Sequence, residues 1–205
     1  MTMQDEGTEP ATRGRPMSSD LDEAILEAAC AVLARQGYRG FSFDAVARTA
    51  GTTRPAIYRR WSNREELLLA ALDHVMRVDT GPLDVRQSFG QLSDAELVAA
   101  FEQMGLAFAA IVSERRASAV SISVSAAMYE DEALRKLTQA HHYDRRKPLR
   151  EMMELLRERG LLRDDLPVED LIHVLVGAVQ YRSNMLLEPV DEHFVRNILK
   201  LIFRC

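Results

Sequence analysis

Residues 42–67 read SFDAVARTAGTTRPAIYRRWSNREEL, a stretch that predicts two short helices joined by a tight turn. Ser42 has the side chain of an N-terminal helix cap, and Gly51 supplies the positive φ at which the first helix can stop. Thr53 has the same capping chemistry for a second helix. Pro55 falls in the first turn of that helix, where its missing N–H is not needed. The stretch therefore predicts a helix, a sharp turn and a second helix in immediate succession.

The spacing of Ala47, Gly51 and Ile57 fits a helix-turn-helix unit. Such a unit needs a small residue where the second helix crosses the first, a turn residue able to take positive φ, and an apolar residue that locks the second helix in place. An ordinary helical hairpin in an all-α core is the alternative interpretation. The outward face of the second helix favours the first interpretation, because it carries three arginines and a tyrosine and no acid.

Arginine can bridge O6 and N7 of guanine in the major groove, and tyrosine can contact phosphate or a thymine methyl group. Ser42 and the N–H groups after it predict one phosphate contact, and Arg64 predicts a second. Arg13 and Arg15 lie in a segment that suits an arm in the minor groove, with a solvated tail as the alternative. The predicted DNA-contacting residues are Arg13, Arg15, Ser42, Thr52, Thr53, Arg54, Pro55, Tyr58, Arg59, Arg60 and Arg64.

Composition places the chain among ordinary globular proteins, with 205 residues, 47% apolar and 28% charged. The formal net charge at pH 7 is −5, yet residues 13–62 hold eight basic and five acidic residues. A basic segment on a larger acidic body indicates two tasks divided between two parts. The longest nearly apolar run covers 171–179, far short of the about 20 residues of a membrane span. With two cysteines and no secretory signal, the sequence predicts a cytoplasmic protein with no membrane partner.

Apolar residues recur at helical spacing along nearly the whole chain, which predicts an all-α fold. Only Ile111–Val124 could alternate as a strand, and its alanine-rich surroundings favour a helix there too. Capping-box patterns would open three helices, at Asp20 with Glu23, at Ser62 with Glu65 and at Ser93 with Glu96. Later helices are expected at about 93–113, 116–129, 132–159 with a kink at Pro148, 168–187 and 191–203.

The expected organisation follows from these helices and from a linker over 79–92, where two glycines and a proline interrupt any periodicity. The chain is expected to comprise a flexible arm over 1–17, a three-helix helix-turn-helix DNA-binding domain over 18–62, a connecting helix over 63–78, and a larger helical ligand-binding and dimerisation domain over 93–205.

Residues 21–78 resemble the N-terminal domain of TetR/AcrR-type transcriptional regulators. The resemblance rests on Ala28-Ala29, the Gly37-Tyr38 turn, Phe41-Ser42-Phe43 and the ordered string from Val46 to Leu67. Trp61 stands where the family usually has phenylalanine, and Arg64 is the usual basic residue before Glu65. The resemblance implies an all-α, dimeric protein that binds palindromic operators.

The C-terminal half matches that family less specifically, and its last two expected helices resemble the usual dimer-forming pair. The predicted dimer residues are Leu171, Leu175, Ala178, Phe194, Ile198 and Leu201; packing on the chain's own core is the alternative. The resemblance also implies a small-molecule pocket, which methionine, aromatic and polar side chains could line. The candidate lining residues are Met104, Phe108, Met128, Tyr129, Met152 and Gln180; plain core packing is again the alternative.

The histidines do not predict a metal site. His141 and His142 are adjacent and diverge by about 100° on a helix, so a solvated pair is expected rather than two ligands of one ion. His173 lies on an apolar stripe, which predicts a core histidine. No metal and no cofactor is expected.

These patterns favour a homodimeric repressor that binds a palindromic operator and is released by a small-molecule effector. The alternatives are a regulator that acts without a ligand and an activator. An enzyme is not expected, because the chain has no nucleotide-binding glycine loop, no Gly-x-Ser-x-Gly elbow and no His-Glu-x-x-His pair.

Overall fold

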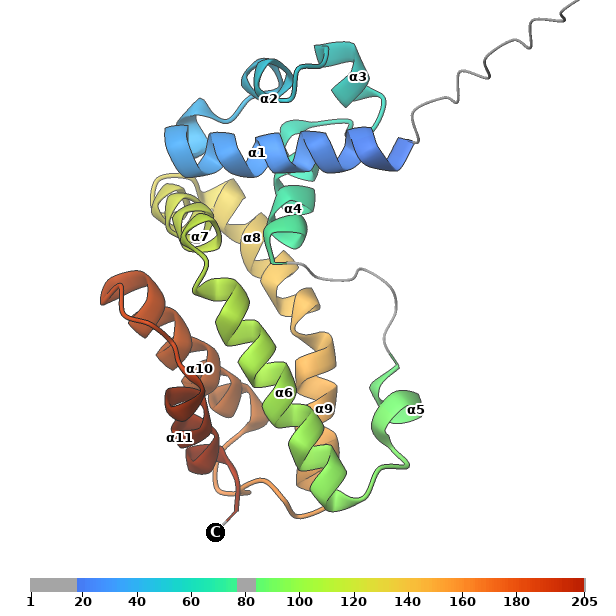
Figure 1. Cartoon of the computed structure of the whole chain (residues 1–205), viewed down its shortest axis with the longest axis vertical. Helices are drawn as coiled ribbons and strands as arrows, with labels where there is room; N and C mark the ends of the chain where they lie inside the picture. Colours follow the sequence, from blue (N-terminus) through green and yellow to red (C-terminus); the bar gives the residue numbers. More distant parts are fainter. Residues whose placement is uncertain (1–17, 77–83, 205) are drawn as a thin grey trace, which may run out of the picture.

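The computed structural model describes residues 18–76 and 84–204, and these residues form the predicted all-α fold, with a helix-turn-helix unit at one end of a larger helical body (Figure 1). Among them the only β-type pairing is an isolated bridge between Leu162 and Phe203. The helices are α1 (Ser18–Gly40), α2 (Phe43–Thr49), α3 (Arg54–Tyr58), α4 (Arg64–Val75), α5 (Val85–Phe89), α6 (Asp94–Val112), α7 (Arg115–Met128), α8 (Glu132–Arg145), α9 (Lys147–Glu158), α10 (Val168–Gln180), the π-helical turn η1 (Tyr181–Met185) and α11 (Glu192–Ile202).

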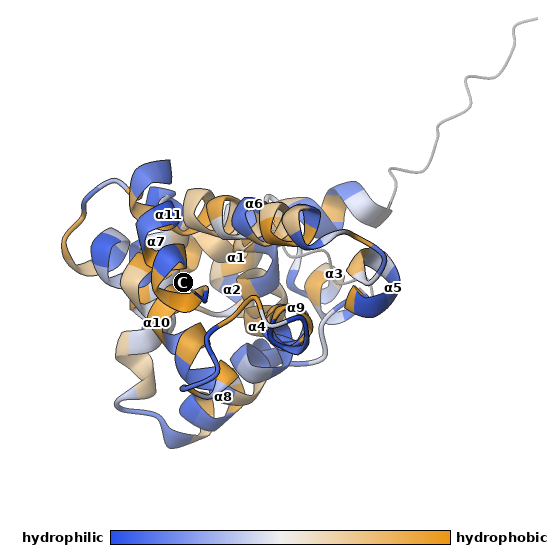
Figure 2. Cartoon of the chain, turned by 90° about the horizontal axis from the view of Figure 1, so that it is seen from below, coloured by the Kyte–Doolittle hydropathy of each residue, from blue (hydrophilic) through white to orange (hydrophobic). Residues whose placement is uncertain are grey.

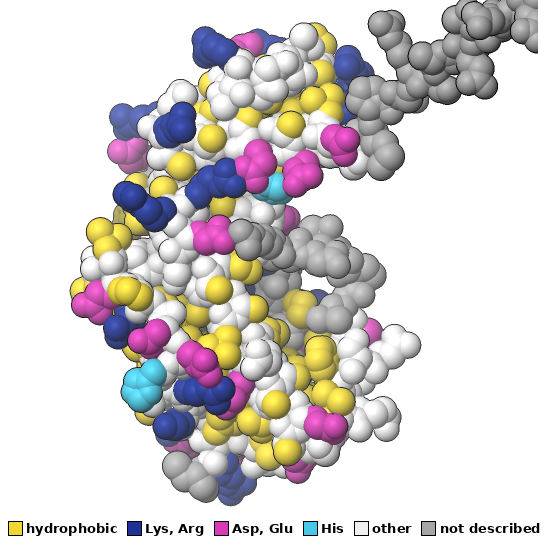
Figure 3. Space-filling model, viewed as in Figure 1, with side chains coloured by type: hydrophobic (Ala, Val, Ile, Leu, Met, Phe, Trp, Pro, Cys, Tyr) yellow, Lys and Arg dark blue, Asp and Glu magenta, His cyan; other side chains and the backbone are white. Residues whose placement is uncertain are grey.

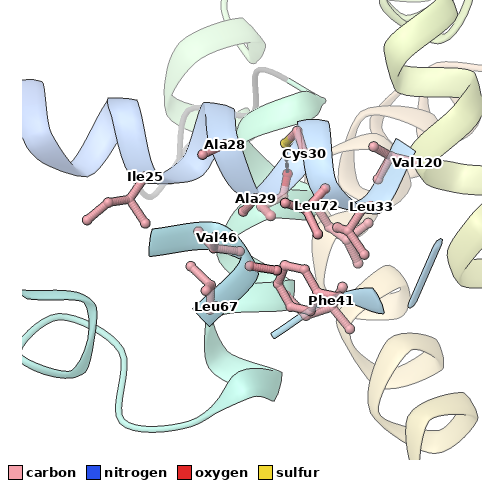
Figure 4. Close-up of a cluster of buried hydrophobic side chains, with 14 of the residues drawn as sticks. Ile25, Ala28, Ala29, Cys30, Leu33, Phe41, Val46, Leu67, Leu72 and Val120 are labelled. Carbon is pink, nitrogen blue, oxygen red and sulfur yellow. Dashed lines mark hydrogen bonds between the residues drawn. The ribbon is translucent and has the colours of Figure 1, made fainter. Parts of the chain in front are cut away.

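The N-terminal unit rests on the body through α1. This helix lies across the top of the body, with α2 and α3 above it and α4 leading downward (Figure 1). It packs against α4 and α7, and buried side chains such as Leu33, Phe41, Leu67 and Val120 fill the space between these helices (Figure 4). Because Val120 belongs to α7, the helix-turn-helix unit shares its hydrophobic core with the body.

The body has a second core of its own. Most of its helices carry both hydrophobic and hydrophilic residues (Figure 2). The apolar sides of α6, α9, α10 and α11 meet around buried residues such as Phe101, Leu156, Ile172 and Val195. Ile111–Val124 is helical apart from the short break between α6 and α7, so the helical interpretation of this stretch is confirmed.

Two predicted helix starts differ from the structure. α1 already includes Ser18, two residues before Asp20. α4 begins at Arg64 with Asn63 as its cap, so the expected capping box of Ser62 with Glu65 is wrong by one residue. The Asn63 Oδ1 accepts the Glu66 N–H at 2.7 Å, which leaves the Glu66 carboxylate to accept the Ser62 N–H at 2.7 Å. The capping box of Ser93 with Glu96 is confirmed.

Three predicted helix boundaries in the body also change. The expected kinked helix over 132–159 is two helices separated at Arg146, because Pro148 cannot continue a helix but fits the first turn of α9. The expected helix over 168–187 ends as α10 at Gln180 and continues as η1. The expected linker contains α5, where the buried Val85 packs into the body core; its earlier residues, 79–83, and the expected arm over 1–17 lie outside the described residues.

α6 is the helix of the described chain that is long and apolar enough to cross a membrane by length and composition alone, with a mean hydropathy of 1.5 over its most apolar window. The sequence had directed attention to 171–179 instead. Leu97, Phe101 and Gly105 on α6 are buried, and the helix packs against α7, α9, α10 and α11. These contacts give the apolar composition of α6 a role in the core of the body.

Candidate nucleic-acid interface and internal cavity

Side-chain caps fix the starts of the two short helices that carry the candidate interface. Ser42 has an extended backbone, and its Oγ accepts the Ala45 N–H at 3.2 Å at the start of α2. Thr53 does the same for α3, its Oγ1 accepting the Ala56 N–H at 3.4 Å. The oxygens of Ser42 and Thr53 therefore orient the helices, whereas their hydroxyl hydrogens remain available to an outside acceptor.

The turn between α2 and α3 is fixed by glycine geometry and apolar packing. Gly51 has φ +64°, a backbone conformation that would be strained for a residue with a side chain at this position. The Thr52 N–H then donates to the Ala47 carbonyl oxygen at 2.9 Å, closing the turn. Ala47 and Ile57 are both buried, so the second helix is held across the first as the spacing predicts.

The opposite side of α3 is exposed. Thr53, Arg54, Pro55, Tyr58 and Arg59 all face solvent there. Basic side chains, all of them arginines in this part of the chain, lie at the end of the molecule formed by α2 and α3 (Figure 3). Arg59 forms no ion pair among the described residues. The structure thus brings five of the predicted DNA-contacting residues together on one accessible surface.

Arg54 is held in position before any DNA arrives. Its guanidinium donates to the Tyr58 hydroxyl at 3.0 Å and lies 3.1 Å from the Asp44 carboxylate. The hydrogen bond to Tyr58 and the charge of Asp44 raise the pKa of Arg54. The Tyr58 ring stands edge-on to Phe43 at 4.5 Å between centroids, which limits its motion in turn. A base or phosphate must compete with Asp44 for Arg54.

Arg60 and Arg64 correct the sequence prediction. The Arg60 side chain is only 18% exposed, donates to the Ala56 carbonyl oxygen at 3.1 Å and pairs with Asp22 of α1. Arg64 stacks over the Tyr38 ring at 3.9 Å and donates to the Tyr38 carbonyl oxygen. Both guanidinium groups hold α3 and α4 against α1, so a DNA contact by either must compete with these interactions.

The remaining predicted contacts fall into two groups. Thr52 is half-buried in the turn, and Arg13 and Arg15 lie outside the described residues. Sequence reasoning missed Arg48 of α2, which is exposed and has no ion pair in the described chain. The sequence offered a signal for it, because Arg48 is one of four arginines in residues 41–61, where Asp44 is the sole acid.

Ion pairs connect the N-terminal unit to the body. Glu27 of α1 accepts from His74 of α4 at 3.0 Å and also pairs with Arg116 of α7. Burial works to raise the pKa of Glu27, but the His74 hydrogen bond and the Arg116 charge outweigh it and leave the pKa below its usual value. α1, α4 and α7 therefore meet at one carboxylate.

A cavity of about 610 Å³ lies where α4 enters the body, between α4, α6, α7, α10 and the junction of α8 with α9. Three candidates, Met104, Phe108 and Gln180, line it. The described residues that line it are Leu72, Val75, Met76, Phe101, Met104, Gly105, Phe108, Ala117, Ser121, Val124, Ser125, His142, Arg145, Arg146, Pro148, Leu149, Leu175, Val176 and Gln180.

Three other pocket candidates are corrected. Tyr129 is 91% exposed on the outer surface, and Met152 is buried in the body core. Met128 packs against the hydrophobic core that the helix-turn-helix unit shares with α7. Helical periodicity placed these side chains correctly on helices but could not show which faces close around the cavity.

The histidines are also placed differently from the prediction. His141 is mostly buried, with its Nε2 3.0 Å from Asp73, and His142 lines the cavity, so the pair is not solvated. His173 has a mainly exposed side chain and is not a core histidine. No group of three or more His, Cys, Asp or Glu side chains that could hold a metal occurs in the described part of the chain.

His142 makes the stability of the fold sensitive to mild acid. Burial, together with the charges of Arg145 and Arg146, lowers the pKa of His142 from 6.5 to about 4. The folded state therefore binds fewer protons than the unfolded state between these values, and stability is lost as the pH falls below 6.5. On going from pH 7 to pH 5, we expect the wild type to lose about 2 kcal/mol more unfolding free energy than His142→Gln.

Urea unfolding at the two pH values measures this difference. The matched control is His173→Gln, which removes an exposed imidazole and should retain the acid sensitivity of the wild type. An equal loss in the wild type and His142→Gln would show that the His142 imidazole titrates normally in the fold.

The outer face of α10 and α11 is open and carries both apolar and polar side chains, with His173 and Lys200 exposed on it as well. Leu171 and Leu175, expected at a dimer interface, are only 1% and 3% exposed and pack into the chain's own core, which a partner cannot reach. Val174 and Leu201 instead face outward, 41% and 55% exposed. Ala178, Phe194 and Ile198 are half-buried between these positions and the core, and keep part of their surface accessible.

Two short capped helices, with an exposed arginine and tyrosine face at the end of an all-α body, define a helix-turn-helix DNA-binding regulator. Comparison with known proteins agrees. Residues 25–71 match the family model of bacterial regulatory proteins of the tetR family, and residues 93–202 match that of the tetracyclin repressor-like C-terminal domain. The chain belongs to the TetR family of transcriptional regulators.

Individual relatives are distant. An HTH-type transcriptional regulator of Bacillus subtilis strain 168, YdeS, is 23% identical over 94% of this chain and 92% of its own length. The DNA-binding transcriptional repressor TetR of Mycobacteroides abscessus is 54% identical over 24% of this chain and 26% of its own length.

Solved structures share the fold. A TetR-family regulator from Mesorhizobium loti superimposes with a TM-score of 0.60 at 16% identity, over 93% of this chain and 100% of the other. A TetR regulator from Agrobacterium tumefaciens gives 0.62 at 20% identity, over 89% and 94%.

Proposed function

We propose that the protein is a homodimeric repressor that binds a palindromic operator through α3 and is released by a small-molecule effector. The observation that carries the DNA-binding part is the exposed face of α3, where Arg54, Tyr58 and Arg59 project from a helix whose other side is locked into the core. The repressor named among the relatives supports the sign of regulation. Such a protein acts in the cytoplasm of a bacterium, where the DNA is.

A dimer is needed because α3 has only five residues and reaches few base pairs. Helix-turn-helix dimers read two half-sites about 34–36 Å apart, or a multiple of that distance. The open outer face of α10 and α11, where Val174 and Leu201 are exposed among polar side chains, is the surface that we assign to the contact between protomers. Burial of this face supplies a hydrophobic driving force for association.

Effector release is supported by the position of the cavity. Leu72, Val75 and Met76 of α4 and its C-terminal cap form part of its wall, and α4 follows directly after the helix-turn-helix unit. A ligand that prefers one placement of α4 shifts the protein toward that state, to the extent of its differential affinity for the two placements. A regulator that works without a ligand is the second candidate, and it predicts no compound-dependent change in operator affinity.

Removing one side chain from the exposed face tests the interface. Arg59→Ala and Tyr58→Ala should each weaken operator binding by about 1–3 kcal/mol while the oligomeric state stays unchanged. The measurement is fluorescence anisotropy at fixed salt, with an operator obtained by selection from random duplexes. The matched control is Arg115→Ala, which removes an exposed charge on α7 that has no ion pair in the described chain. If Arg59→Ala and Tyr58→Ala bind the operator as tightly as the wild type, α3 does not contact DNA through these side chains.

A further inference from the structure

The cavity has two chemically different regions. Most of its wall is apolar, with Phe101, Met104 and Phe108 of α6 facing Leu175 and Val176 of α10. The junction of α8 and α9 is different, because it contributes basic side chains to the wall. None of the described residues that line the cavity is acidic. A ligand that fits this cavity has a large apolar part and a polar group that interacts favourably with basic side chains.

Arg145 and Arg146 provide that positive charge. The Arg145 side chain is only 17% exposed, so its charged guanidinium is poorly solvated, and this burial lowers its pKa. Arg146 has no acidic partner among the described residues, and it stands at the break between α8 and α9. Two cations therefore share one end of a mainly apolar cavity.

The carboxylate that pairs with Arg145 is incompletely bonded. Asp73 of α4 lies outside the cavity lining, with its Oδ1 3.2 Å from the Arg145 Nε and 3.0 Å from the His141 Nε2. None of these three buried atoms forms an aligned hydrogen bond. Because one carboxylate serves two neighbours in poor geometry, hydrogen-bonding capacity of Arg145 is left over for a second anion.

We propose that the effector is an amphipathic organic anion, with its anionic headgroup between Arg145 and Arg146 and its apolar body against Phe101, Met104 and Phe108. The cavity, at about 610 Å³, has the size of ordinary small-molecule sites, which span about 300–1,000 Å³. Charge-assisted hydrogen bonds from a guanidinium to a carboxylate are among the stronger polar contacts and fix the headgroup. The role of this anion as an effector rests on the proposed function. Its binding in the cavity does not depend on whether it changes the affinity of the protein for DNA.

The same headgroup has a route to the DNA-binding unit. An anion that bonds Arg145 competes with Asp73, and Asp73 lies on α4, whose start is anchored to α1 by Arg64. Loss of the Asp73–Arg145 contact removes one of the ionic links between α4 and α8. The anion therefore interacts differently with the two placements of α4, as a releasing ligand must.

Three probes of equal chain length separate charge from apolar burial. The full-length protein is titrated calorimetrically with decanoate and decyltrimethylammonium below their micelle concentrations, and with decan-1-ol below its solubility limit. Decanoate should bind most tightly, by about tenfold or more over decan-1-ol. The cation should bind most weakly. Equal affinity for decanoate and decan-1-ol, or no decanoate binding, overturns the proposal.

Variants locate the headgroup. Arg146→Gln should lose about tenfold in decanoate affinity and keep its affinity for decan-1-ol, whereas Arg146→Lys should retain most of the preference and Arg115→Gln all of it. An unchanged preference in Arg146→Gln also overturns the proposal. Operator binding is measured separately. If decanoate binds to the protein without releasing DNA, only the release mechanism is contradicted. If the protein binds the operator but no decanoate, only the proposed ligand class is contradicted.

Discussion

Replacing Gly177 with glutamate is expected to separate the proposed dimer and to weaken binding to the selected operator by about 10³-fold or more. Gly177 lies on the exposed side of α10, and a Cβ added there meets no atom within 4 Å, so the protomer accommodates the new side chain. In a dimer the same carboxylate is buried against the second copy without a partner, which is strongly unfavourable. A monomer then reads one half-site only.

Light scattering after size-exclusion chromatography measures the mass of the particle. Circular dichroism checks that the variant is folded, and fluorescence anisotropy measures its affinity for the operator. Ala133→Glu is the matched control, since it adds the same charge at an exposed position of α8. A folded Gly177→Glu protein that stays dimeric would place the interface elsewhere. One that is monomeric but binds the operator as tightly as the wild type would exclude a dimeric operator reader.

The second large effect is expected from Ile57→Ala, which should cost about 2–5 kcal/mol of unfolding free energy, because it leaves a cavity beneath α3. Ile57 is fully buried, and α3 has five residues, too few to be stable without this anchor. DNA binding should fall with it. Urea unfolding gives the stability change.

Ile122→Ala is the control for Ile57→Ala, because it deletes the same atoms from a side chain that is 39% exposed on α7. It should change stability by about 1 kcal/mol or less. Similar losses in the two variants would mean that Ile57 does not anchor α3.

The exposed surface of α3 was largely predictable because its determinants are local. The caps at Ser42 and Thr53, the positive φ of Gly51 and the inward Ile57 act within a few residues of one another. Short-range rules therefore place the exposed side of α3 without knowledge of the rest of the chain.

The errors arise where distant parts of the chain meet. Arg60 is engaged by Asp22, and Arg64 by Tyr38, and neither partner is signalled by the sequence around the arginine. The apolar stripe of α10 was recognised, but periodicity does not say which side faces the chain's own core, so Leu171 and Leu175 were assigned to the wrong partner. The cationic end of the cavity depends on the helix break at Arg146, which brings the α8–α9 junction to the cavity wall.

Selection of binding sites from random duplex DNA by the full-length protein shows whether α3 reads an operator. We expect an enriched two-fold symmetric motif with half-sites separated by one helical turn or a multiple of it, and loss of that enrichment in Arg59→Ala. A folded, dimeric sample that enriches no motif, or one that enriches the same motif with Arg59→Ala as with the wild type, would contradict the assignment of α3 as the element that reads the operator.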